Sequence, residues 1–267
     1  MKLAFIGGGT MAEAIISGVL SSGVAAAEDV SVGEPLEERR RTLRDRHGVL
    51  ATAVNAEAAA PADVVVLSMK PQDLSRALAD LNGDLREDQA ALSIVAGARM
   101  STIVEGLGHA AVIRVMPNTP AQVGQGMSLW TCSPQVPQAA REAARSVLGT
   151  VGKEIYVSDE KYLDMATALS ASGPAYVFLF IEALIDAGVH VGLPRDMSRT
   201  LAVQTVLGST KLVEETGRHP ALLKDMVTSP GGTTVEGLLA LEQGGLRSAV
   251  INAVVAAYKR SVELGRQ

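Results

Sequence analysis

The glycine-rich run at residues 5–12 is the segment best suited to hold a charged ligand, because it follows an apolar run and precedes a helical pattern. It matches G-x-G-x-x-A at Gly7, Gly9 and Ala12. In this pattern the first glycine permits a tight turn, the second lets the backbone approach a diphosphate, and the small third residue packs close to a sheet. Unpaired N–H groups at the helix N-terminus then favour an anion. The run therefore predicts a dinucleotide site, with a plain tight turn as the alternative.

A second candidate site lies at residues 228–234, which read Thr-Ser-Pro-Gly-Gly-Thr-Thr before an apolar helix. Thr233 and Glu236 have the T-x-x-E spacing of a capping box. The preceding Gly231 and Gly232 leave backbone N–H groups uncovered, which is the chemistry of a carboxylate site. Ser229 adds a hydroxyl. The alternative is a plain, well-capped loop.

Alternating strands and helices in the first half predict an α/β fold with a parallel, doubly wound sheet that is covered on both faces. A junction with a helix N-cap at residues 158–159 predicts a boundary between residues 1–158 and residues 159–267. The expected strands are residues 3–6, 30–32, 50–53, 64–67, 91–95, 112–115, 126–131 and 155–157.

The second half reads as helices throughout, with an interruption at Gly173 and Pro174. Several of these helices are apolar on more than one side, which indicates burial all round. So much apolar helical surface in about a hundred residues predicts packing against a partner subunit, and hence at least a dimer. The expected helices after the interruption are residues 195–215, 220–227, 234–242 and 246–264.

Composition excludes several classes of function. A net charge of -5 and only 3% aromatic residues argue against a nucleic-acid surface. The lone Cys132 is interpreted as a packing residue, and the four histidines lack ligand-like spacing, so no metal site is expected. The N-terminus lacks signal-peptide features, and the longest apolar run, residues 175–181, is too short for a membrane span. A cytoplasmic protein without membrane partners is expected.

The end of the second predicted strand bears on cofactor choice. Glu34 is placed to accept hydrogen bonds from ribose hydroxyls and to repel a 2′-phosphate, which gives a slight preference for NADH. Arg39, Arg40 and Arg41 on the next helix keep NADPH open as phosphate contacts, unless they form a solvated helix face. Asn55 is interpreted either as an adenosine contact or as an N-cap.

Four motifs, taken in order with the glycine turn, resemble the pyrroline-5-carboxylate reductase family over essentially the whole chain. The resemblance implies an N-terminal Rossmann-type dinucleotide-binding domain followed by an all-α C-terminal dimerisation domain. It implies NAD(P)H-dependent reduction of L-1-pyrroline-5-carboxylate to L-proline, the last step of proline biosynthesis. It also implies a homodimer as the minimum unit, with larger rings of dimers in some members. The motifs are residues 66–71, 114–120, 169–176 and 228–234.

The resemblance also implies roles for individual residues. Thr234 would lie near the ring nitrogen as the catalytic residue, orienting it first and donating a proton second. Ala171 and Glu34 depart from residues found in many members. The implied substrate-binding residues are Ser229, Gly231, Gly232, Thr233 and Thr234. The implied cofactor-binding residues are Ile6, Gly7, Gly8, Gly9, Thr10, Met11, Glu34, Asn55, Ser68, Met69, Lys70, Pro71, Ile94, Val95 and Ala96.

Two other functions compete with this assignment. A 3-hydroxyacid dehydrogenase would need a catalytic Lys or His on the early helices of the second half, where Lys161 and Lys211 lack partner motifs. A non-catalytic dinucleotide sensor would need no carboxylate loop. Lys70 fits a cofactor contact better than a catalytic role, and Arg114 fits a structural ion pair. The sequence leaves open the choice of NADH or NADPH, assembly beyond a dimer, feedback by proline and activity on the six-membered imine.

Overall fold

The computed structural model describes residues 1–265, and the chain forms two compact units. The first unit contains Met1–Ser172 and the final segment from Ala257 onward, and the second contains Gly173–Ala256. The division between the units falls later in the chain than the junction expected at residues 158–159, and it lies within a helix rather than a loop.

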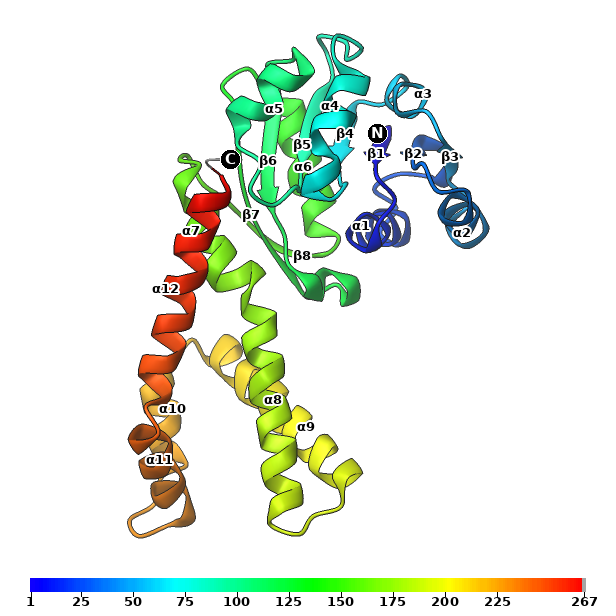
Figure 1. Ribbon diagram of the computed structural model, residues 1–267. Coiled ribbons are helices and arrows are strands. Elements are labelled where there is room, and N and C mark those ends of the chain that lie inside the picture. Colours follow the sequence, from blue (N-terminus) through cyan, green and yellow to red (C-terminus); the bar gives the residue numbers. More distant parts are fainter. Residues whose placement is uncertain (266–267) are drawn as a thin grey trace. The chain divides into compact units, whose positions relative to one another are not determined.

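An eight-stranded sheet forms the centre of the first unit, in the order β3-β2-β1-β4-β5-β6-β7-β8 (Figure 1). Neighbouring strands run parallel, as the sequence predicts, except β6 and β7, which are antiparallel. Residues 117–125 join the two and are too short for the crossover that parallel neighbours require. The strands are β1 (Leu3–Ile6), β2 (Val30–Gly33), β3 (Leu50–Thr52), β4 (Val64–Leu67), β5 (Ala90–Ser93), β6 (Val112–Met116), β7 (Gly126–Cys132) and β8 (Gly152–Tyr156).

Helices cover both faces of this sheet, as the sequence predicts. Phe5 and Val66 face a core completed by helices α1, α2 and α6, whereas Ile6 and Leu67 face a second core completed by α3, α4 and α5. Because successive residues of a buried parallel strand point to opposite faces, the continuous apolar runs follow from this double cover. The helices are α1 (Thr10–Ser21), α2 (Glu37–His47), α3 (Asn55–Ala59), α4 (Leu74–Leu81), α5 (Met100–Leu107), α6 (Gln138–Gly149) and α7 (Lys161–Ala166).

The interruption predicted near Gly173 and Pro174 takes the form of a π-helical turn, Thr167–Ala171, between α7 and α8. Ser172 N–H donates to the Thr167 carbonyl at 2.9 Å. Pro174 has no N–H to give to the Ser170 carbonyl, and Asn118 Nδ2 donates to that carbonyl at 3.2 Å instead. The proline therefore frees an acceptor that the first unit uses.

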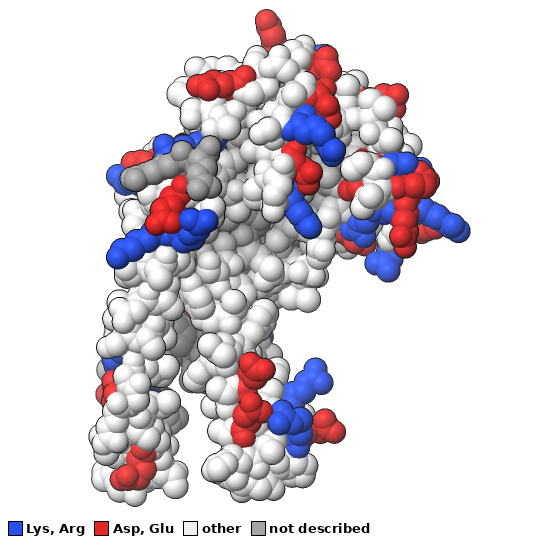
Figure 2. Space-filling view, in the orientation of Figure 1, with Lys and Arg blue, Asp and Glu red and all other residues white. Residues whose placement is uncertain are grey.

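The second unit is helical and has almost no interior of its own. Among residues 173–256, all of which are described, only Ser198 and Ala202 are buried. Phe178 and Leu179 on α8 are 61% and 66% exposed, and Figure 2 shows long stretches of α8 without charged side chains. These apolar faces need a covering surface. The helices are α8 (Gly173–His190), α9 (Arg195–Thr216), α10 (Pro220–Met226), α11 (Thr233–Gln243) and α12 (Leu246–Leu264), the last of which continues into the first unit.

The continuous helix Lys161–His190 is longer than the apolar run that the sequence displays. By length and composition alone it is able to cross a membrane, with a mean hydropathy of 1.6 over its most apolar window. Only 6% of that window is buried in the single chain. The same exposed surface is what a subunit interface would cover.

Candidate functional site

A cavity of about 450 Å³ opens in the first unit where β1, β2 and β4 end. Because the strand order reverses between β1 and β4, this edge is the topological switch point at which such sheets bind ligands. Nine of the residues predicted to bind the cofactor line the cavity. They are Ile6, Gly7, Gly8, Gly9, Glu34, Asn55, Ser68, Met69 and Lys70.

The glycine turn lines part of this cavity. Gly7 has φ +96°, and a Cβ there would lie 2.9 Å from the backbone nitrogen of Met69, so only glycine fits. Gly9 is the N-cap of α1, and no atom lies within 4 Å of the position that its Cβ would take. No described side chain caps this helix end. The open backbone N–H groups fit the diphosphate of a dinucleotide.

Glu34 closes the turn from the side of β2. Its Oε2 accepts from Gly8 N–H at 2.8 Å and its Oε1 accepts from Leu36 N–H at 3.0 Å. The residue is only 8% exposed. A carboxylate has about four acceptor positions, so ribose hydroxyls still have room to donate.

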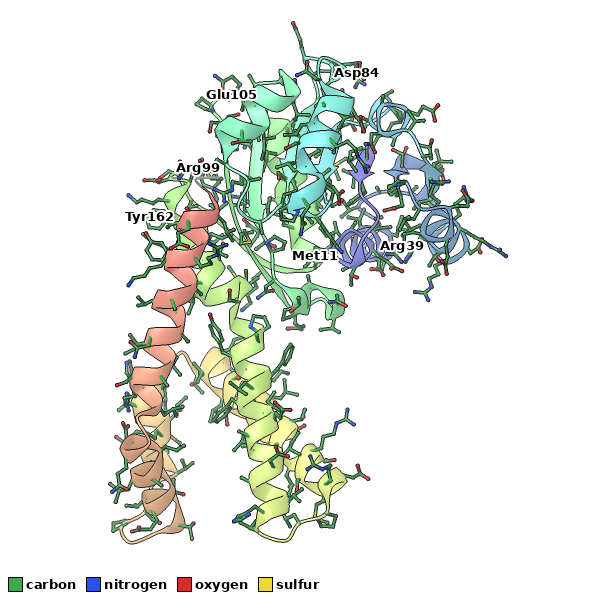
Figure 3. All side chains as sticks on the ribbon, in the orientation of Figure 1. Met11, Arg39, Asp84, Arg99, Glu105 and Tyr162 are labelled. Atoms are coloured by element: carbon green, nitrogen blue, oxygen red, sulfur yellow. The ribbon has the colours of Figure 1, made fainter. Side chains whose placement is uncertain are left out.

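Arg39 reaches the same turn from α2 and lies in the cavity wall (Figure 3). Its Nε donates to the carbonyl of Gly8, and its Nη2 pairs with Glu13 Oε2 at 2.5 Å. Burial raises the pKa of Glu13, but hydrogen bonds from Arg39 and His47 outweigh this and lower it to about 2. Arg39 is therefore part of the site and not a solvated helix face, whereas the exposed Arg41 pairs with Asp45 on the surface.

Six predicted cofactor residues do not line the cavity. Thr10 and Met11 form the first turn of α1, and Pro71 begins a short 3₁₀ turn (Pro71–Asp73). Ile94, Val95 and Ala96 follow β5, where Ile94 N–H donates to the Leu67 carbonyl at 3.0 Å.

Asn55 is one of the predicted residues that line the cavity. Asn55 opens α3 with Val54 as N-cap, so the N-cap alternative for Asn55 is wrong. Its Nδ2 instead donates to Asp80 at 3.1 Å. Sequence reasoning missed several other cavity residues that carry no motif of their own. They are Gly33, Pro35, Leu36, Asp73, Arg76 and Ala77, whereas Arg39, which the sequence offers as a phosphate contact, also lines the cavity.

The carboxylate-binding candidate lies in the second unit, between α10 and α11. Gly231 has φ +68°, and Gly232 N–H donates to the Ser229 carbonyl at 3.0 Å, which closes a tight turn. Gly232, rather than Thr233, is the N-cap of α11, and no described side chain caps it, so the predicted capping box is wrong. Thr234 lies half-buried in the first turn. The loop therefore brings the hydroxyls of Ser229, Thr233 and Thr234 together with the backbone N–H groups at the start of α11.

Arg114 forms the structural ion pair that the sequence predicts. It is 2% exposed on β6, and its Nη1 lies 2.7 Å from Glu160 Oε1 while Nη2 lies 3.6 Å from Asp164. The guanidinium fixes α7 against the sheet, which leaves it unavailable to a substrate.

The chain matches two protein families, one over each end. Residues 160–264 match "Pyrroline-5-carboxylate reductase dimerisation", and residues 2–97 match "NADP oxidoreductase coenzyme F420-dependent". A pyrroline-5-carboxylate reductase from Synechocystis is 46% identical over 100% of this chain and 99% of its own length.

Solved structures agree with this similarity. A pyrroline-5-carboxylate reductase from Coxiella burnetii has a TM-score of 0.92 and 35% identity, covering 100% of this chain and 99% of its own. A pyrroline carboxylate reductase from Plasmodium falciparum with NADP bound has a TM-score of 0.90 and 33% identity, covering 99% and 98%.

Proposed function

The chain belongs to the pyrroline-5-carboxylate reductase family, and we propose that it reduces L-1-pyrroline-5-carboxylate to L-proline with NADH or NADPH. The observation that carries the proposal is the full-length similarity to reductases of that name, joined to a cavity built on the glycine turn. No comparable feature favours a hydroxyacid dehydrogenase or a sensor.

The reaction asks this chain mainly to bind and orient. When bound, the reduced nicotinamide supplies the hydride that converts the C=N bond of the cyclic imine to C–N, and the nitrogen carries or takes up the proton. We propose that Ser229 and Gly231–Thr234 hold the substrate carboxylate through their amides and hydroxyls. The Thr234 hydroxyl orients the ring nitrogen. Because an iminium is already electrophilic, no strong side-chain acid is required.

We propose NADH as the preferred cofactor. Glu34 supports this preference, because its buried carboxylate would repel a 2′-phosphate on the adenosine ribose. The remaining predicted cofactor residues, including Thr10, Met11 and Ile94–Ala96, are proposed to contact the dinucleotide from the strand ends and the first turn of α1.

We propose that residues 159–267 form the dimerisation and substrate domain of a homodimer, with rings of dimers as the larger assembly. The exposed apolar faces of α8 support pairing through this region. A cytoplasmic location with neither nucleic-acid nor membrane partners is proposed, and the net charge of -5 supports the absence of a nucleic-acid surface. Light scattering distinguishes a dimer from a ring.

The test is oxidation of NADH and of NADPH in the presence of pyrroline-5-carboxylate, with proline measured as the product. Turnover with proline formation supports the proposal. Absence of turnover in protein that binds either cofactor contradicts it.

Thr234→Ala tests the orienting role within that assay. It is expected to lower kcat/KM about 10- to 100-fold through misplacement of the reacting atoms, with little change in cofactor affinity. Thr42→Ala is the matched control, because Thr42 is half-buried in a helix, as Thr234 is, and its hydroxyl donates to the Glu38 carbonyl. An unchanged rate for Thr234→Ala would remove its assigned role.

A further inference from the structure

We infer that Glu13 sets how strongly the cavity discriminates against a 2′-phosphate, because it holds the Arg39 guanidinium away from the ligand. The inference rests on the proposed use of a nicotinamide dinucleotide. Glu13 lies outside the glycine motif and does not line the cavity, so it is a positioning residue that acts through Arg39.

Arg39 is the cation best placed to meet a phosphate beside Glu34. Both residues line the cavity and both contact the Gly8 peptide, Glu34 at its N–H and Arg39 at its carbonyl. The cavity has two other cations: Lys70, which follows β4, and Arg76, which lies on α4. Neither belongs to the turn between β2 and α2. A phosphate added next to Glu34 would therefore compete with Glu13 for the Arg39 guanidinium.

Glu13 opposes that movement. Its carboxylate pairs with Arg39 at 2.5 Å, with side-chain exposures of 20% for Glu13 and 25% for Arg39. Its second oxygen contacts His47 Nε2 at 3.1 Å and Arg46 at 3.3 Å, so three basic side chains face it from α2. A carboxyl with a pKa of about 2 stays ionised at neutral pH. Glu13 therefore keeps its charge, and its attraction for Arg39, at neutral pH.

The neighbouring Arg40 does not replace Arg39. Its Nη1 donates to the carbonyls of Glu34 and Pro35, at 2.6 Å and 2.8 Å, and its Nη2 pairs with Glu37. Both arginines close to Glu34 are thus already engaged by acidic or carbonyl oxygens. A 2′-phosphate carries about two negative charges and would have to compete for one of them.

The experiment measures the dissociation constants of NADH and NADPH for the full-length protein by cofactor fluorescence. Glu13→Gln keeps the size of the side chain and removes its charge, so Arg39 loses its ionic partner while its Nε keeps the bond to the Gly8 carbonyl. The ratio of NADPH affinity to NADH affinity is expected to rise about five-fold, the scale of one partly exposed ion pair. The gain is expected to disappear in the double variant Glu13→Gln with Arg39→Ala, since alanine offers no cation to the phosphate.

Glu38→Gln is the matched control, because it removes the same charge from an exposed position at the start of α2. An equal rise in that control, persistence of the gain in the alanine double variant, or an unchanged ratio in Glu13→Gln overturns the inference. Because binding is read without turnover, a protein that binds both cofactors but makes no proline contradicts the reductase activity and leaves this test valid.

Discussion

Gly7 and Gly9 are expected to respond differently to the same added methyl group. Gly7 has φ +96° and backbone atoms of Met69 and Ser68 within 3.1 Å of a built Cβ. Gly9 has φ −69° and open space in the same position. The pair therefore separates a requirement of the fold from a requirement of the ligand.

For Gly7→Ala, a left-handed conformation costs about 1–2 kcal/mol. Overlap with rigid backbone adds about 1–3 kcal/mol. The expected loss in the free energy of unfolding is therefore about 2–5 kcal/mol, with weaker cofactor binding as well. For Gly9→Ala, the unfolded chain has less conformational entropy, which stabilises the folded protein by about 0.4–1 kcal/mol. Alanine is a poorer N-cap than glycine, which costs a similar amount. Its stability is expected to stay within about 0.5 kcal/mol of the parent.

Cofactor affinity gives the decisive measurement for Gly9→Ala. If a diphosphate occupies the space above Gly9, the methyl group overlaps it, and the dissociation constant for NADH rises about ten-fold or more, equivalent to about 1.4 kcal/mol. Urea unfolding of the cofactor-free protein and calorimetric titration with NADH measure the two quantities. An unchanged affinity in Gly9→Ala would refute the placement of the diphosphate.

Three further perturbations test other features. Arg114→Leu is expected to lower the free energy of unfolding by about 3 kcal/mol in urea, because Glu160 and Asp164 lose their buried cation; a loss below about 1 kcal/mol would show that the pair is dispensable. Leu179→Asp is expected to shift the assembly toward monomers by light scattering, since an interface would bury the new charge; unchanged mass would exclude this part of α8 from the interface. Burial raises the pKa of Glu13, but its basic partners hold it at about 2, below the ordinary 4.5, so its contribution to stability is present above pH 4.5 and lost as pH falls toward 2. Urea midpoints between pH 2 and 6 should therefore fall less in Glu13→Gln than in the parent, and parallel curves would contradict this.

Local patterns were sufficient to place the strands and the glycine turn. Apolar runs such as residues 64–67 report burial on two faces, and the strand-turn-helix context of Gly7 reports a tight turn. The same runs do not report direction, so the antiparallel course of β7 could not be predicted from them. The interruption before α8 was predictable from Pro174, but the hydrogen bond from Asn118 to the Ser170 carbonyl joins residues far apart in the chain and was not.

Local sequence patterns could not predict which side chains from distant parts of the chain pair with each other. On sequence alone Arg39 resembles Arg41, since both lie in a charged run on one helix. Only the fold brings Arg39 against Glu13 and the Gly8 carbonyl. The capping box at Thr233 failed for a related reason, because the start of a helix shifts by one residue without changing the motif.

The scarcity of buried side chains in residues 173–256 makes completion of this unit a bimolecular event. One chain forms these helices, but the apolar contacts that stabilise them come from a second chain. The stability of this unit therefore depends on protein concentration. Dilution should then loosen α8 and α9 before it disturbs the sheet. In a cell with two diverged versions of this protein, apolar faces that do not match would favour homodimers over mixed dimers. The packing that completes the fold would then also select the partner.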